Sequence, residues 1–82
     1  MEGEIDLRTA EAFSAAVTEA CMRNCPLDLT GVTFMDSNGL RILLAAASGR
    51  TGPPLVVRDS QPVRRLFEVA APAGVPGLQF EP

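Results

Sequence analysis

Hydrophobic residues recur along the chain at two spacings, and the alternation of these spacings predicts the order of the elements. Helical spacing of i, i+3, i+4 predicts three amphipathic helices. Their apolar stripes consist of Phe13, Ala16, Val17, Ala20 and Cys21; Leu40, Leu43, Leu44 and Ala47; and Val63, Leu66 and Phe67. We expect Phe13, Phe34 and Phe67 to anchor the core and Phe80 to lie at an edge. Arg64 and Arg65 belong to the solvated face of the third helix.

Short strand patterns lie before, between and after these helices. The predicted strands are Glu2–Asp6, Leu27–Val32, Leu55–Arg58 and Leu78–Phe80. In the second, apolar and polar residues alternate, and Gly31 marks a bulge or bend. The order β-α-β-α-β-α-β predicts one α/β domain over residues 1–82, with a small, mostly parallel sheet on which the helices pack.

Cap residues precede each predicted helix. The candidates are Thr9; Asp36 and Ser37; and Asp59 and Ser60, with Pro62 suited to a first turn. The first helix is expected to stop at Asn24 and Pro26. Residues Ala71–Gly77 contain two Pro and two Gly and are expected to form a loop.

Composition narrows the chemistry that is open to the chain. It has no His and no Lys, so a serine hydroxyl lacks its usual activating base and a zinc site lacks a full ligand set. Seven Arg and ten acidic residues leave a net charge of −3, which disfavours nucleic acid and anionic membrane surfaces as partners. We therefore expect a protein that is not an enzyme and holds no metal or cofactor.

Compartment and redox state follow from three features. The longest apolar run, Ile42–Ala47, is too short to span a bilayer, and the acidic start lacks the features of a signal peptide. Cys21 and Cys25 are spaced C-x3-C, and on one helix their Cβ atoms would lie about 5–6 Å apart, against about 3.5–4.5 Å in a disulfide. We expect a cytoplasmic protein with two reduced thiols, at least one of them packed; a redox switch is the alternative.

Two strand-to-helix turns carry polar clusters, Asp6–Thr9 and Asp36–Gly39. In parallel sheets, function gathers at the carboxyl ends of strands, where such turns lie. Ser37 is expected in or beside the helix N-cap, where exposed N–H groups and the helix dipole tolerate an anion. Two interpretations stay open at this point: the turn merely caps a helix, or Ser37 accepts a phosphoryl group that changes what can dock.

The segment LDLTGVTFMDSNGLRILLAA, Leu27–Ala46, resembles the signature of STAS domains, specifically the anti-sigma factor antagonists. The upstream GEIDLRTAEAF and the downstream VVRDSQPVRRLFEVA are similar to flanking parts of the same family, so the resemblance covers nearly the whole chain in order. The usual first strand and last helix of that family are missing. We expect the exposed edge strand to favour a homodimer or to reduce stability.

The resemblance implies a bacterial regulatory function. An antagonist of this family binds an anti-sigma factor that is a serine kinase, which frees the sigma factor. Phosphorylation of the antagonist releases it, and a phosphatase resets it. Carried onto this chain, the acceptor is Ser37, and the partner-binding residues are Asp6, Met35, Asp36, Ser37, Asn38 and Gly39. Met35 is either an exposed partner contact or a core residue. A STAS module of another complex, such as a lipid-transport accessory protein or a stress-signalling scaffold, is the alternative function.

Overall fold

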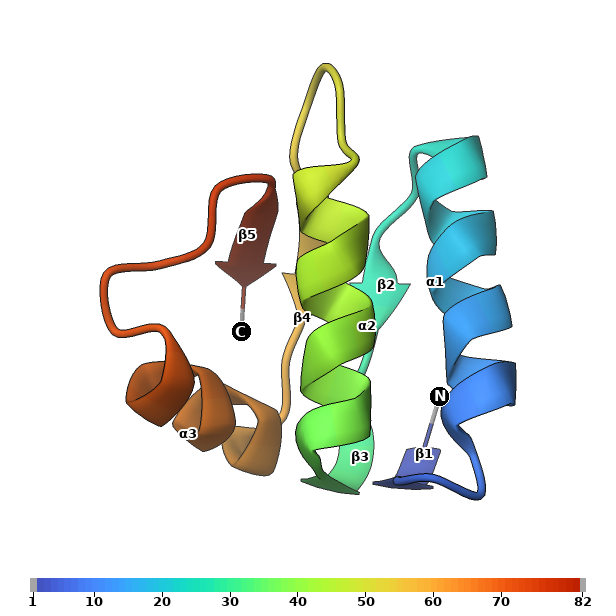
Figure 1. Cartoon of the computed structure of the whole chain (residues 1–82), viewed down its shortest axis with the longest axis vertical. Coiled ribbons are helices and arrows are strands. Elements are labelled where there is room, and N and C mark those ends of the chain that lie inside the picture. The colour runs from blue at the N-terminus through green and yellow to red at the C-terminus, as the bar shows by residue number, and fades with distance from the viewer. Residues whose placement is uncertain (1, 82) are drawn as a thin grey trace.

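The computed structural model describes residues 2–81, in which the three predicted helices and three of the four predicted strands form (Figure 1). In chain order they are β1 (Glu2–Ile5), α1 (Ala10–Arg23), β2 (Leu27–Asp28), β3 (Gly31–Met35), α2 (Ser37–Ser48), β4 (Leu55–Arg58), α3 (Gln61–Ala70) and β5 (Leu78–Glu81). The order differs from the expected one at a single place, where the second predicted strand becomes two. No helix in this part of the chain is both long enough and apolar enough to cross a membrane.

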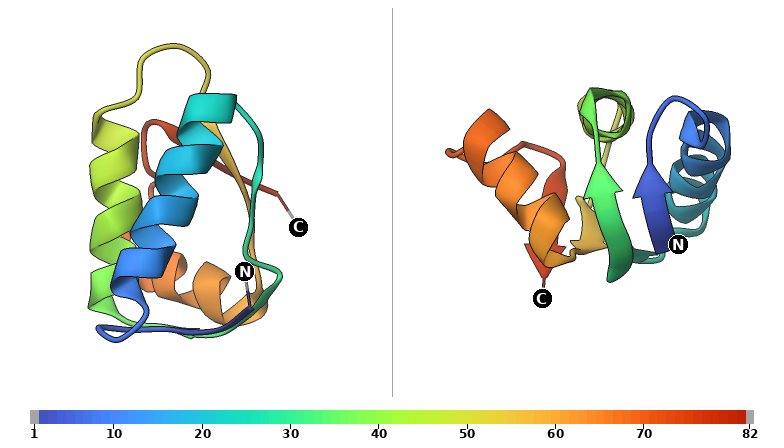
Figure 2. Two further views of the ribbon diagram at one scale, coloured as in Figure 1. Left: turned by 90° about the vertical axis from the view of Figure 1, so that its right-hand side faces the viewer. Right: turned by 90° about the horizontal axis from the view of Figure 1, so that it is seen from below.

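The strands pair in parallel throughout the described residues. β1 pairs with β3, and β4 lies between β2 and β5. Figure 2 shows α1 and α2 side by side on one face of the strands, while α3 packs against β3. The fold is therefore the small α/β architecture that the alternating pattern predicts. β1 and β3 form one parallel sheet and β2, β4 and β5 form another, so the single small sheet expected from the sequence is divided in two. Pairing brings the carboxyl ends of β1 and β3 to one edge, at the bottom of Figure 1.

The predicted strand Leu27–Val32 is wrong as a single element, and a turn is the reason. The Asp28 carboxylate accepts hydrogen bonds from the Thr30 backbone N–H at 2.9 Å and from the Thr30 hydroxyl at 2.7 Å. The Val32 N–H then donates to the Leu29 carbonyl at 3.0 Å, which closes a β-turn with Gly31 inside it. The chain consequently pairs with β4 before this turn and with β1 after it.

A bulge in β3 changes which of its side chains face the core. Gly3 pairs with Val32 and Glu4 pairs with Phe34, so Thr33 is an extra residue without a partner on β1. An extra residue reverses the inside–outside alternation beyond it. Met35 is therefore buried, whereas Phe34 is 48% exposed and is not the core anchor that we predicted. Gly3, opposite the bulge, has φ +86, which a side chain would strain.

The core lies between the strands and helices. Its largest fully buried side chains are Phe13, Ile5, Leu29, Leu43, Leu55, Val32, Val57 and Val63. Each Leu, Ile or Phe buried in this way stabilises the fold by about 1.5–3 kcal/mol relative to exposure. Phe67 is also buried, and its ring packs 4.8 Å from that of Phe80 on β5. Leu44 is 38% exposed and is the only residue of the predicted apolar stripes that is neither buried nor half-buried.

Helix boundaries follow the predicted signals. α1 ends at Asn24, which adopts a left-handed conformation with φ 52. α2 begins after Asp36, and α3 begins after Ser60 with Pro62 in its first turn. Thr9 occupies the N-cap of α1 but its hydroxyl makes no bond to the helix. Cys21 packs against the core as one of two free thiols, and Cys25 is exposed.

Candidate functional site

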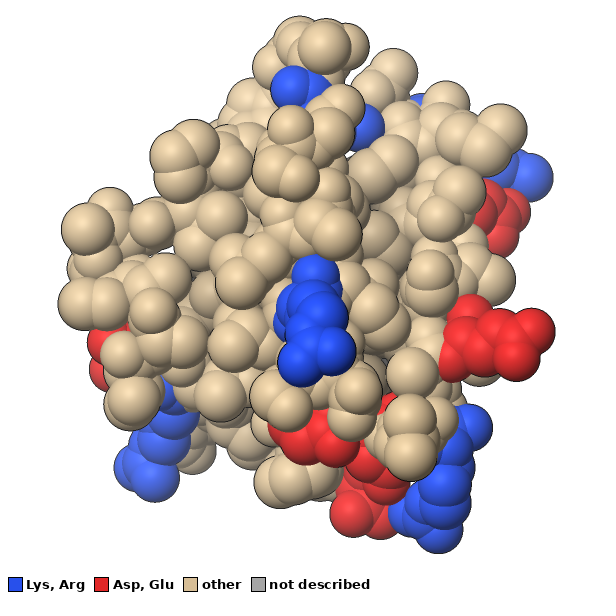
Figure 3. Space-filling view, in the orientation of Figure 1, with Lys and Arg blue, Asp and Glu red and all other residues tan. Residues whose placement is uncertain are grey.

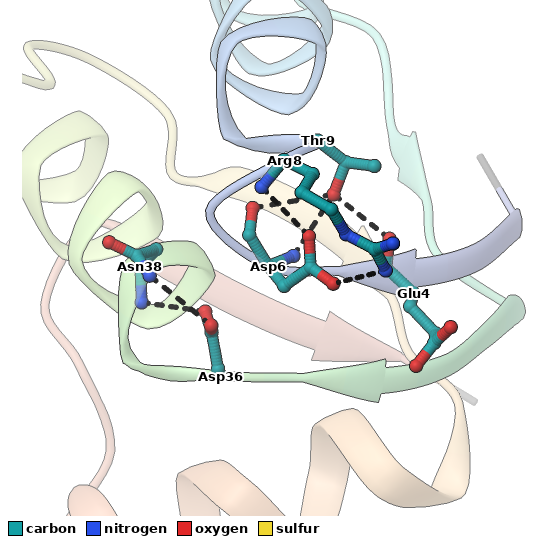
Figure 4. Close-up of polar contacts among 6 residues, drawn as sticks. All are labelled: Glu4, Asp6, Arg8, Thr9, Asp36 and Asn38. Atoms are coloured by element: carbon teal, nitrogen blue, oxygen red, sulfur yellow. Dashed lines mark hydrogen bonds and ion pairs between the residues drawn. The ribbon is translucent and has the colours of Figure 1, made fainter.

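Two polar turns stand side by side at the carboxyl edge of the strands. Ile5 and Met35 are paired at the ends of β1 and β3, and the Asp36 backbone N–H donates to the Ile5 carbonyl at 3.0 Å. The residues that follow these strands, Asp6 and Asp36, are consequently neighbours on adjacent turns (Figure 4). The structure thus brings together the two clusters that lie some thirty positions apart in the sequence.

The Asp36 turn caps α2. Asp36 has extended backbone angles, and its Oδ1 accepts the Asn38 backbone N–H at 2.8 Å. Its Oδ2 accepts a hydrogen bond from the Asn38 side-chain amide at 3.2 Å (Figure 4). An N-cap carboxylate of this kind stabilises a helix by about 1 kcal/mol. Both oxygens of Asp36 are therefore engaged within its own turn.

Ser37 is the first residue of α2 and is exposed to solvent. Within residues 2–81 its hydroxyl has no hydrogen-bond partner. The cap itself is Asp36, so Ser37 lies beside the cap, which is one of the two places expected from the sequence. An exposed, unpaired hydroxyl at this point is open to a protein partner.

The Asp6 turn is held by its own residues. The Arg8 guanidinium lies 3.0 Å from Asp6 Oδ2, and the Arg8 backbone N–H donates to Oδ1 at 2.9 Å. The side-chain hydrogen bond from Arg8 is the main reason that the pKa of Asp6 lies below its usual value of 3.8. The Thr9 hydroxyl accepts the Asp6 N–H at 2.9 Å and donates to the Glu4 carbonyl at 2.9 Å. Asp6 is therefore an ionised carboxylate in a rigid turn.

Met35 and Gly39 lie beneath the turn rather than on its surface. Met35 is 5% exposed, and Gly39 is buried against it. A Cβ added at Gly39 would lie 2.6 Å from Met35 Cγ and 2.8 Å from Ile5 Cγ2. Of the two alternatives for Met35 the core is the correct one. Both residues position the turn, and in this structure neither presents a surface to a partner.

The family model described as "Mlab, STAS domain" matches residues 1–77 of the chain. This chain belongs to the STAS domain family. No solved structure matches the chain. STAS domains are protein-interaction modules, which agrees with a site made of exposed polar turns on a packed scaffold. Among the described residues, no three Cys, Asp or Glu side chains are grouped to hold a metal ion.

This STAS domain has two polar contacts that sequence reasoning missed. Arg8 pairs with Asp6 in the turn between β1 and α1, where neither helical nor strand periodicity applies. Asp59 follows β4, its side chain is 2% exposed, and it accepts hydrogen bonds from both Nε and Nη2 of Arg64 at 3.1 Å. Arg64 lies on an exposed face of α3, as expected, but its guanidinium is paired with Asp59.

A cleft of about 320 Å³ lies between α3 and the segment that leads to β5. Phe67, Val75 and Phe80 line it, with the Asp59–Arg64 pair on one side. None of the site residues predicted from the sequence lines this cleft. The paired Asp6 and Asp36 turns, and not the cleft, are the candidate site of this STAS domain.

Proposed function

We propose that this STAS domain is a non-enzymatic, cytoplasmic anti-sigma factor antagonist that is switched by phosphorylation of Ser37. Its docking surface is the exposed part of the paired turns, namely Asp6, Asp36, Ser37 and Asn38. Its partner is an anti-sigma factor of the serine-kinase type, and a phosphatase returns it to the binding state. The observation that carries the proposal is the exposed, unpaired hydroxyl of Ser37 beside the Asp36 cap.

The modification is chemically simple. The partner kinase transfers the γ-phosphoryl group of ATP to the Ser37 oxygen, the hydroxyl proton leaves, and ADP is the leaving group. The chain itself needs no catalytic base, because the kinase supplies both the nucleotide site and the base that accepts the hydroxyl proton. The product carries about −1.5 to −2 charges at pH 7 on a surface that already holds the two carboxylates of Asp6 and Asp36.

The negative charge of the phosphoryl group would release the chain from the anti-sigma factor. Like charges brought together across an interface cost several kcal/mol, about 2–5 kcal/mol for a doubly charged group. Each 1.4 kcal/mol of lost interface free energy weakens binding about tenfold. The fold should survive, because Ser37 is solvated and the core residues Met35 and Gly39 lie beneath it.

The first experiment asks whether Ser37 is the acceptor. The native chain, Ser37→Ala and Ser48→Ala are each incubated with candidate kinase-type anti-sigma factors and ATP, and phosphate is located by mass spectrometry. Ser48 is a matched control, since it is an exposed serine at the other end of α2. We expect phosphate on the native chain and on Ser48→Ala only. Label on Ser37→Ala would exclude Ser37 as the main acceptor.

The second experiment asks whether the charge causes release. Ser37→Glu should weaken binding to the same anti-sigma factor by tenfold or more, while its far-UV circular dichroism stays native. Loss of helical signal in Ser37→Glu would show that the added charge unfolds the domain, and the surface switch would then be wrong.

A second candidate function is a STAS docking module that is never phosphorylated, as in lipid-transport accessory proteins or stress-signalling scaffolds. The observation that favours it is the Asp36–Asn38 turn, in which the Asn38 backbone N–H already donates to the Asp36 carboxylate, so this donor needs no phosphate as an acceptor. This alternative predicts that Ser37→Ala binds its partner as tightly as the native chain and that no kinase partner modifies it.

A further inference from the structure

One backbone N–H at the helix end next to Ser37 is already occupied. The Asn38 N–H, which would otherwise be free at the start of α2, donates to the Asp36 carboxylate at 2.8 Å. A phosphoryl group on Ser37 would therefore compete with a carboxylate for the helix terminus and would be repelled by it. A cation nearby on the surface would offset this repulsion.

Arg41 is the basic residue placed to supply that cation. It lies four positions after Ser37 on α2, and both residues are exposed. Residues at i and i+4 lie on the same face of a helix, and a helical side chain leans towards the preceding turn, so Arg41 leans towards Ser37. An acid that precedes its base by four residues also has the more favourable orientation with respect to the helix dipole.

The other Arg residues near this edge are engaged. Arg8 is paired with Asp6, and Arg64 is paired with Asp59. Arg41 takes part in no ion pair among residues 2–81. Figure 3 shows basic atoms over α2, with uncharged atoms around them and acidic atoms below, and Arg41 is the only basic residue of that helix.

We propose that Arg41 binds the phosphoryl group of phosphorylated Ser37 as an i,i+4 ion pair along α2. The inference rests on the proposed phosphorylation of Ser37. A planar guanidinium can hold two phosphate oxygens at once, which suits this short span. The pair has a consequence for docking: phosphorylation adds negative charge and also withdraws the one cation that α2 presents to a partner.

The test uses chain in which phosphoserine is inserted at position 37 through a reprogrammed codon, so that no kinase is required. The second pKa of the phosphate is measured by ³¹P NMR titration in the native background, in Arg41→Gln and in Arg65→Gln. Arg65 is the matched control, because it is an exposed Arg on a different helix. The charged groups facing the phosphate are Asp36 on its own turn, Asp6 and Arg8 on the neighbouring turn, and Arg41.

Because the pair favours the dianion, Arg41→Gln should raise the phosphoserine pKa by about 0.2–0.4, and Arg65→Gln should leave it unchanged. Arg41→Lys should give an intermediate value, since it keeps the charge but loses the planar fork. The Arg41 Nε–H resonance should also move when Ser37 is replaced by phosphoserine. Equal pKa values in the native and Arg41→Gln chains, or an equal response to Arg65→Gln, would overturn the inference.

The two proposals fail separately. If no kinase modifies Ser37, the switch is wrong even where the titration shows the ion pair. If the titration shows no pairing while the kinase still labels Ser37, the switch stands and acts through repulsion alone.

Discussion

Gly39 packs so closely on Met35 that the position has no room for a side chain. A Cβ at Gly39 would lie 2.6 Å from Met35 Cγ, a separation that real Cβ atoms do not adopt. Met35 is the last residue of β3, and Gly39 lies in the first turn of α2. The contact between them therefore fixes the position of the Asp36–Asn38 turn relative to the core. The exposed turn thus depends on the packing of buried Met35 against Gly39.

Gly39→Ala is expected to destabilise the domain by about 1–3 kcal/mol, because Met35 and Ile5 must both move to admit the methyl group. Urea denaturation measures the free energy of unfolding. Gly49→Ala is the matched control: the added Cβ would lie 3.7 Å from its nearest neighbour, the Ala45 carbonyl oxygen, which is ordinary contact. A loss in Gly39→Ala no larger than that in Gly49→Ala would contradict the packing account.

Arg64→Gln is expected to destabilise the domain by about 1–3 kcal/mol, since it leaves the buried Asp59 carboxylate without its two charged donors. Arg65→Gln, on the exposed face of α3, should change the free energy of unfolding by less than about 0.5 kcal/mol. Adding Asp59→Asn to Arg64→Gln should recover part of the loss, because a neutral amide is less costly to bury than a charge. Equal effects of the two Arg variants would show that the pair contributes nothing.

Stability should fall in acid partly through Asp6. Its folded-state pKa is lowered below 3.8, chiefly by the hydrogen bond from Arg8, so the unfolded chain binds the proton more readily. The contribution of Asp6 is therefore present above about pH 4 and is lost as pH falls through the lowered value. Native and Asp6→Asn chains, unfolded by urea at several pH values, should differ most near neutrality and converge towards pH 2. A difference that stays constant with pH would exclude this linkage.

The two thiols should differ in reactivity. Cys25 is exposed, whereas Cys21 packs against the core, so an alkylating reagent should modify Cys25 faster in the native state. Mass spectrometry on single Cys→Ala variants assigns each rate. Fast modification of Cys21, or an intramolecular disulfide under mild oxidation, would favour the redox alternative over two structural thiols.

Much of the architecture is readable from local pattern. The stripe through Phe13 and Val17 and the stripe through Leu43 and Ala47 each span two helical turns, and period alone identifies them as helices with a buried face. The Asp36 cap and the Asn24 stop are equally local, since each depends on one side chain and its own turn. The alternation of strands and helices, and with it parallel pairing, follows from these signals, whereas the division of the strands into two sheets does not.

The site was predicted only in part. Asp36, Ser37 and Asn38 are consecutive, and their exposure at the end of a strand follows from the pattern. The Arg8 partner of Asp6 was not foreseen, because it depends on how the chain turns after β1, and the Arg64 partner of Asp59 depends on where α3 starts.

The sequence by itself determined the three helices and the strands β1, β4 and β5, because hydrophobic period and caps are properties of neighbouring residues. It did not determine the division of the second predicted strand into β2 and β3. Only the tertiary structure decided which face of β3 is inside. Thr33 has no partner on β1, and this one unpaired residue reverses the side chains beyond it, so Met35 enters the core and Phe34 faces solvent. A bulge is set by the register between two strands, and register belongs to the pair of strands rather than to either one.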